Sequence, residues 1–105
     1  MSMKLANIIK NSGLDTIEFK LSSEIPITLY DRKNRIIDDP DIKFVKFLFE
    51  DNDSSFERFH ELLKEIEKTT DTISSIEVKI DEFCVVLRIP GKGFHIFSRV
   101  QKIDF

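Results

Sequence analysis

Cysteine, glycine and proline are scarce in this sequence, and tryptophan is absent. The single cysteine, Cys84, has no second cysteine to pair with, which argues against a disulfide-rich secreted scaffold and fits a reducing cytoplasm. The three glycines and three prolines leave little material for a flexible linker. Gly91-Lys92-Gly93 is too short for a phosphate-binding loop, and no helical pattern follows it.

Long apolar runs are lacking as well. No stretch reaches the roughly 18 apolar residues that a membrane-spanning helix needs, and residues 1–10 lack the apolar centre of a signal peptide. We therefore expect a cytoplasmic protein with no membrane partner. Hydrophobic residues make up 41% of the chain and include ten phenylalanines, enough for a packed core. The 105 residues match the usual length of one domain, so 1–105 is predicted to be a single domain.

Charge is unevenly distributed along the chain, although the formal net charge is only −3. Residues 38–82 contain fourteen acidic and six basic side chains, a balance of −8. Residues 83–105 contain one acidic and four basic side chains, a balance of +3. Such segregation indicates surfaces of opposite sign, and each sign suggests a different class of partner.

The strongest periodic pattern lies in residues 54–70. Its apolar side chains recur at helical spacing: Phe56, Phe59, Leu62, Leu63 and Ile66. Ser54 and Glu57 have the spacing of a capping box at the start of a helix. We predict an amphipathic helix here, and its apolar side requires a sheet or other helices to cover it.

Residues of alternating polarity predict a series of short strands. The segments with this pattern are 16–21, 25–29, 35–37, 42–49, 76–80, 83–89 and 94–100. Turns are predicted at Asn34, at 90–93 and at Asp81-Glu82, where the apolar positions change from even to odd numbers. Residues 4–11 are predicted to form a short N-terminal helix that ends before Gly13.

Together these elements predict an α+β fold. We expect a mainly antiparallel sheet of five to seven short strands with the principal helix, about 54–70, packed on it. The N-terminal helix is expected to cover an edge or the same face. The order helix, three strands, helix, three strands resembles the double-wing DNA-binding domain of a phage transcription factor, which implies nucleic-acid binding as one function to consider.

Candidate metal and catalytic residues do not form a recognisable site. Lys64 occupies the position where a second helical zinc ligand would follow His60, and Cys84 with His95 supplies only two ligands. The acidic segment at Asp51 lacks the glycine and final glutamate of a calcium loop. No nucleophile motif or catalytic spacing is present. We predict no metal, no cofactor and no enzymatic activity.

The acidic middle of the chain supports the leading hypothesis. Acidic side chains on the predicted helix and in the turn before it form the candidate protein-binding face: Asp51, Asp53, Glu57, Glu61 and Glu65. Complementary charge accelerates encounter with a basic protein and selects the partner. We predict a small non-catalytic binding protein that acts through a protein partner, as an accessory, inhibitor or immunity-type factor.

The basic C-terminal hairpin, residues 83–102, supports the alternative hypothesis of a nucleic-acid-binding regulator. The candidate contacts are Arg88, Lys92, His95, Phe97, Arg99 and Lys102. If the alternation of each strand holds, Arg88, His95, Phe97 and Arg99 share one face, where cations contact phosphates and the aromatic ring stacks on a base. The composition, rich in isoleucine, lysine, aspartate and asparagine, is typical of AT-rich genomes such as those of phages and mobile elements.

Overall fold

The computed structural model describes residues 6–21, 25–68 and 75–105. These residues form one helix and eight strands: β1 (Ala6–Ile9), β2 (Leu14–Lys20), β3 (Ile27–Tyr30), β4 (Phe44–Glu50), α1 (Ser54–Lys68), β5 (Ile76–Asp81), β6 (Cys84–Ile89), β7 (Gly93–Ser98) and β8 (Val100–Asp104). The α+β class is therefore confirmed. Within the described part of the chain, no helix has the length and apolar character needed to cross a membrane.

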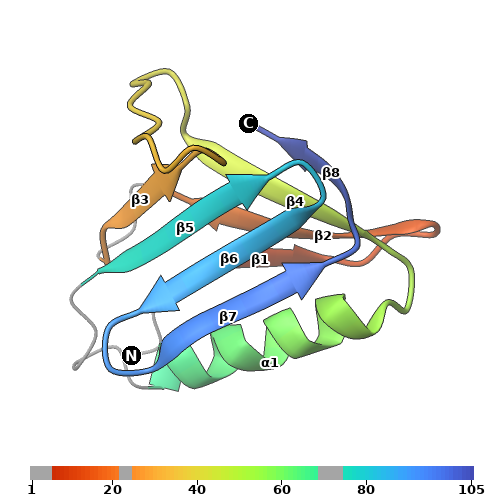
Figure 1. Cartoon of the computed structure of the whole chain (residues 1–105). Coiled ribbons are helices and arrows are strands. Elements are labelled where there is room, and N and C mark those ends of the chain that lie inside the picture. The colour runs from red at the N-terminus through yellow and green to blue at the C-terminus, as the bar shows by residue number, and fades with distance from the viewer. Residues whose placement is uncertain (1–5, 22–24, 69–74) are drawn as a thin grey trace.

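The strands form two four-stranded sheets. Sheet A has the order β1-β2-β4-β8 and is antiparallel throughout, whereas sheet B has the order β3-β5-β6-β7 with a parallel β3–β5 pair. In Figure 1 the two sheets lie one in front of the other, and α1 runs alongside β7. The chain passes from sheet B to sheet A between β7 and β8, at Arg99, whose φ is 65°.

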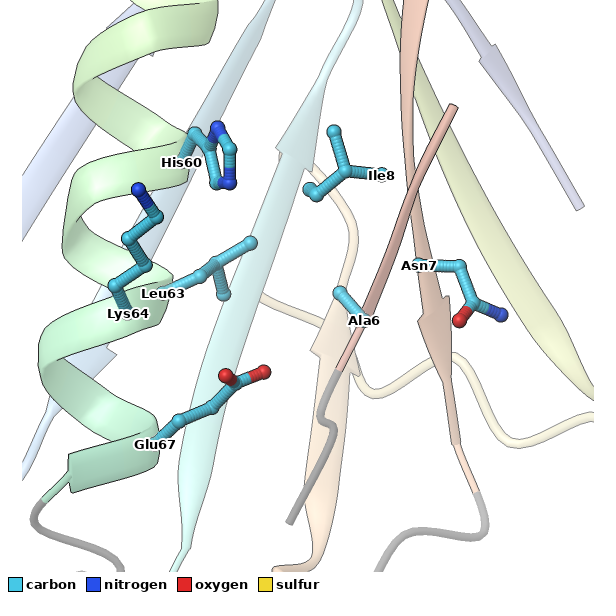
Figure 2. Close-up of a pocket in the computed structure, with 7 residues that line it drawn as sticks. All are labelled: Ala6, Asn7, Ile8, His60, Leu63, Lys64 and Glu67. Atoms are coloured by element: carbon cyan, nitrogen blue, oxygen red, sulfur yellow. The ribbon is translucent and has the colours of Figure 1, made fainter. Parts of the chain in front are cut away.

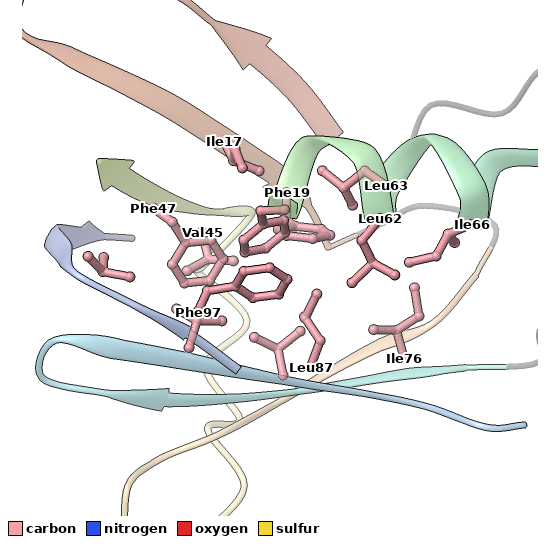
Figure 3. Packing of buried hydrophobic residues seen from close by; sticks show 14 of the residues in the cluster. Ile17, Phe19, Val45, Phe47, Leu62, Leu63, Ile66, Ile76, Leu87 and Phe97 are labelled. Atoms are coloured by element: carbon pink, nitrogen blue, oxygen red, sulfur yellow. The ribbon is translucent and has the colours of Figure 1, made fainter. Parts of the chain in front are cut away.

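Phenylalanine rings from both sheets and the helix meet in the core. Phe59 of α1 stacks on Phe97 of β7 with ring centroids 4.3 Å apart. On its other sides it contacts the rings of Phe19 at 5.7 Å, Phe47 at 5.9 Å and Phe49 at 6.1 Å. Figure 3 shows how side chains of sheet A, sheet B and α1 converge in this region. One hydrophobic cluster therefore joins all three layers.

Helix α1 confirms the principal prediction but not its cap. The apolar stripe is buried as expected, and the helix begins at Ser54. The backbone N–H of Ser55 donates to Asp53 Oδ1 at 2.7 Å, so Asp53 is the N-cap and Ser54 is the first helical residue. The described helix ends at Lys68, and residues 69–70 of the predicted helix lie outside the described residues.

The predicted N-terminal helix is wrong for residues 6–9, which form β1; residues 4 and 5 lie outside the described part. β1 pairs antiparallel with β2, from Ala6↔Phe19 to Ile9↔Thr16. A two-turn helix is marginal on its own, and pairing with β2 satisfies the same backbone groups. Gly13, φ 107°, lies in the turn between these strands and does not end a helix.

The number of strands exceeds the predicted five to seven, and there are two sheets instead of one. The predicted strand 94–100 is interrupted at Arg99, so its last residue begins β8 in the other sheet. The predicted strand 35–37 is reduced to a single bridge between Ile36 and Tyr30. The turn predicted at Asp81-Glu82 lies one residue later, at Glu82-Phe83, because Asp81 ends β5 and pairs with Cys84. Asn34 has the left-handed conformation expected for it, with φ 62°.

Candidate protein-binding surface

The acidic residues predicted to bind a partner do not form one uninterrupted acidic face. Glu57, Glu61 and Glu65 lie one helical turn apart on the exposed side of α1. Lys10 Nζ lies 3.3 Å from Glu57 Oε1, and Lys64 Nζ lies 3.6 Å from Glu61 Oε1. These cations reduce the negative potential that the glutamates present to a partner.

The two acidic residues before α1 have different structural surroundings. Asp51 is exposed in the turn after β4, and Asp53 caps the helix through the hydrogen bond described above. The acidic group around Asp39 precedes β4, whereas Asp51 follows it, so these two groups lie at opposite ends of the strand (Figure 1). The acidic middle of the sequence is thus divided in space.

The hairpin register separates the residues predicted to contact nucleic acid. Arg88 is opposite Phe94, Leu87 is opposite His95, and Val85 is opposite Phe97. Because residues directly opposite share a face, Phe97 lies on the inner face, where it is 1% exposed. The prediction that Arg88, His95, Phe97 and Arg99 share a face is therefore wrong, because Ile89 pairs with Gly93 and this register puts even-numbered residues of both strands on the outer face.

The remaining basic candidates are dispersed. His95 turns back to the turn between β6 and β7, where its Nε2 lies 3.0 Å from the carbonyl oxygen of Lys92. Arg99 occupies the corner between the two sheets. Lys102 belongs to sheet A, and its Nζ lies 3.5 Å from Asp104 Oδ1. The six residues therefore do not form a continuous basic ribbon.

The outer face of sheet B carries an apolar strip in place of that ribbon. Phe94 is 69% exposed and Ile96 is 57% exposed, and both lie on β7 with side chains on the same face. Val86 of β6 is directly opposite Ile96 and is half-buried. We call Val86, Phe94 and Ile96 the apolar strip.

A fixed polar group borders the apolar strip on the β5 side. Arg88 Nη1 donates to Glu77 Oε2 at 2.8 Å, and the Tyr30 hydroxyl donates to Glu77 Oε1 at 3.4 Å. The guanidinium carbon of Arg88 lies 5.8 Å from the centre of the Phe94 ring, within cation–π range. The hydrogen bond with Glu77 raises the pKa of Arg88, a side chain that is positively charged at physiological pH even without this contact.

Two of the depressions on the described surface lie beside residues discussed above. One, of about 360 Å³, lies beside the apolar strip and is lined by Tyr30, Asn34, Glu77, Lys79, Val86, Arg88 and Phe94. The other, of about 310 Å³, lies between β1 and α1, where Ala6 and Ile8 point towards His60 and Leu63 (Figure 2). None of the described residues lining the second depression carries a hydroxyl or thiol nucleophile. Over residues 6–21, 25–68 and 75–105, no three His, Cys, Asp or Glu side chains group as metal ligands.

Cys84 lies on the same outer face, opposite both Asp81 and Ser98. Burial raises the pKa of the Cys84 thiol, and the negative charge of Asp81 raises it further. At pH 8 the folded protein therefore holds less thiolate than a free thiol does, and we expect Cys84 to react with iodoacetamide more slowly than glutathione. The rate ratio should approach one in 8 M urea; equal rates for the folded protein and glutathione at pH 8 would contradict this prediction.

Sequence reasoning missed Phe94 and Ile96 because it predicted a turn of four residues, 90–93, between the two strands. The turn after Ile89 contains three residues, 90–92, because Ile89 pairs with Gly93. An odd-length turn places odd-numbered residues opposite odd-numbered ones. Since Val85, Leu87 and Ile89 were expected to face inwards, Phe97 would then join the core and Phe94 would face outwards.

This chain has no match among protein-family models, curated proteins or solved structures. The outer face of sheet B combines two large exposed apolar side chains with an arginine and a tyrosine held by one carboxylate.

Proposed function

We propose that this chain is a small non-catalytic binding domain that acts through a protein partner, and that the outer face of sheet B contacts the partner. The observation that carries the proposal is the exposure of Phe94 and Ile96 side by side on one strand, at 69% and 57%. Contiguous apolar side chains on a surface mark interaction sites, because burying them contributes about 25 cal/mol per Å². Phenylalanine, tyrosine and arginine are also enriched at the centres of protein interfaces.

The type of binding protein that we propose follows from the sequence. An accessory, inhibitor or immunity-type factor acts by occupying its partner and needs no nucleophile, and the chain contains no nucleophile motif. The lone cysteine supports a cytoplasmic location. Turnover of a substrate by the purified protein, without any partner, would overturn this proposal.

Two other surfaces have weaker support. Glu57 and Glu61 form ion pairs with lysines of the same chain, so the acidic side of α1 offers a partner a mixture of charges. In the nucleic-acid alternative, Phe97 was expected to stack on a base, but its ring is buried in the core. Lys102, one of the cations expected to contact phosphates, lies in the other sheet. Over the described residues of α1, 54–68, no large apolar side chain is exposed like those of β7.

The test places a photo-cross-linking phenylalanine analogue at position 94 or at position 105 in the native host. Phe94 and Phe105 have similar exposures of 69% and 59%, but Phe105 lies beyond β8, away from the apolar strip. We expect a discrete protein adduct from position 94 and none of the same mass from position 105. Absence of an adduct at position 94, or the same adduct from both positions, would contradict the proposal.

A further inference from the structure

We infer that the partner presents an amphipathic helix with acidic flanks, which packs its apolar side on the apolar strip. This inference rests on the proposed function and adds the chemistry of the partner. It follows from three features of sheet B: the width of the part of its outer face formed by β5, β6 and β7, the sign of the charge around the strip, and the contact that Arg58 makes with the edge of β7.

The width of the face fits a helix. Neighbouring strands lie about 4.8 Å apart, so β5, β6 and β7 together span about 10 Å. A helix with its side chains is about 10–12 Å across. The residues directly opposite one another form rows across these strands: Glu77, Arg88 and Phe94 in one row, then Lys79, Val86 and Ile96 in the next. Each row changes from charged side chains on β5 to apolar side chains on β7.

Cations border the apolar strip on three sides. Lys79 and Arg88 lie towards β5, and Lys92 lies in the turn before β7. Arg58 of α1 lies at the opposite border, where its guanidinium donates to the carbonyl oxygen of Ile96. These four cations are accompanied by two anions of β5, Glu77 and Asp81, one of which is already paired with Arg88, so the local balance is +2 in a chain of net charge −3. Acidic flanks on the partner helix complement this border.

The edge of β7 favours a partner that crosses the face over one that extends the sheet. Arg58 donates to the carbonyl oxygen of Ile96 from the side of α1, and its guanidinium lies 4.8 Å from the centre of the Phe97 ring. A partner strand that paired with β7 would have to displace this arginine. The side chains of Phe94 and Ile96, in contrast, are open to a partner lying across them.

The test is a display library of 18-residue helical peptides with a fixed leucine stripe and randomised flanking positions. Peptides are selected for binding to the full chain and counter-selected against the Ile96→Asp variant. We expect enrichment of aspartate and glutamate in the flanks, and selected peptides that bind about tenfold more tightly than the same peptides with lysine flanks. The Phe105→Asp variant is the matched control, since Phe105 and Ile96 are 59% and 57% exposed, and it should retain binding.

The other possible results of these experiments each contradict the inference, the proposed function or both. Enrichment of basic flanks, no flank preference, or no selected helix would overturn the inference. Should any of these occur while position 94 still cross-links a discrete protein, the proposed function stands and only the chemistry assigned to the partner fails. Binding of labelled duplex or single-stranded oligonucleotides, with a steep loss at rising salt and abolished by Lys79→Glu with Lys92→Glu, would assign the face to nucleic acid and overturn both proposals.

Discussion

Replacing Phe59 by alanine is expected to lower the free energy of unfolding by about 3–5 kcal/mol. Phe59 is fully buried, and its ring contacts those of Phe19, Phe47, Phe49 and Phe97. Alanine would remove apolar surface from the centre of the core and leave a cavity between α1 and both sheets. Urea denaturation followed by circular dichroism measures the change.

The loss at Phe59 is large compared with the 5–15 kcal/mol, roughly, that stabilise a typical domain. Phe59→Leu keeps most of the side-chain volume and should fold with a smaller loss, so the comparison remains informative if the alanine variant is unfolded at 25 °C. Phe105→Ala, at an exposed position, should change the free energy of unfolding by less than about 0.5 kcal/mol. A loss below about 1 kcal/mol for Phe59→Ala would be incompatible with the central position of this ring.

Replacing Phe97 by alanine should also cost about 3–5 kcal/mol of stability, whereas the same change at Phe94 should cost less than about 0.5 kcal/mol. The two residues are on one strand, but Phe97 is 1% exposed and Phe94 is 69% exposed. The same denaturation measurement on both variants decides the face assignment of β7. Equal effects at positions 94 and 97 would show that the strand has a different register.

The contact between Phe59 and Phe97 can be isolated with a double-mutant cycle. Their rings stack with centroids 4.3 Å apart, and such aromatic pairs contribute about 0.5–1.5 kcal/mol beyond the area that they bury. The double alanine variant should therefore lose less stability than the sum of the single variants. Full additivity would show that the two rings do not interact in solution. Phe59→Leu with Phe97→Leu provides a second cycle that leaves smaller cavities.

The spacing of apolar residues correctly predicted the helix and the strands in which that spacing repeats over several helical turns or along most of a strand. Helix α1 repeats its apolar stripe from Phe56 to Ile66, and only a helix brings those side chains to one face. The alternation in β4 likewise puts Phe47 and Phe49 on one face, which is buried, and Phe44 on the other face, which is partly exposed. The helix predicted for residues 6–9 was wrong because a four-residue segment with two isoleucines fits both the helical period and the strand period. Pairing with β2 determines that this segment is a strand.

The spacing of apolar residues within one segment does not predict which strands pair when they are far apart in the sequence. β4 pairs with β8, and β3 pairs in parallel with β5, and neither pairing leaves a signal in the periodicity of its own strands. The division into two sheets depends on these pairs and on the break at Arg99. The candidate surface was misassigned for a related reason: a shift of one residue in the hairpin register exchanges Phe97 for Phe94 on the outer face.

The position of β8 has a consequence for the synthesis of this protein on the ribosome. Phe47 of β4 pairs with Ile103, 56 residues later in the chain. At roughly 5–20 residues per second, a nascent β4 lacks its second neighbour for roughly 3–11 s. Its three core side chains and one open edge are exposed to other nascent chains during that time. Lys46 interrupts the apolar residues of β4 with a charge that lies 3.6 Å from Glu18 of β2, and a charge within an apolar strand opposes pairing with another chain until β8 emerges.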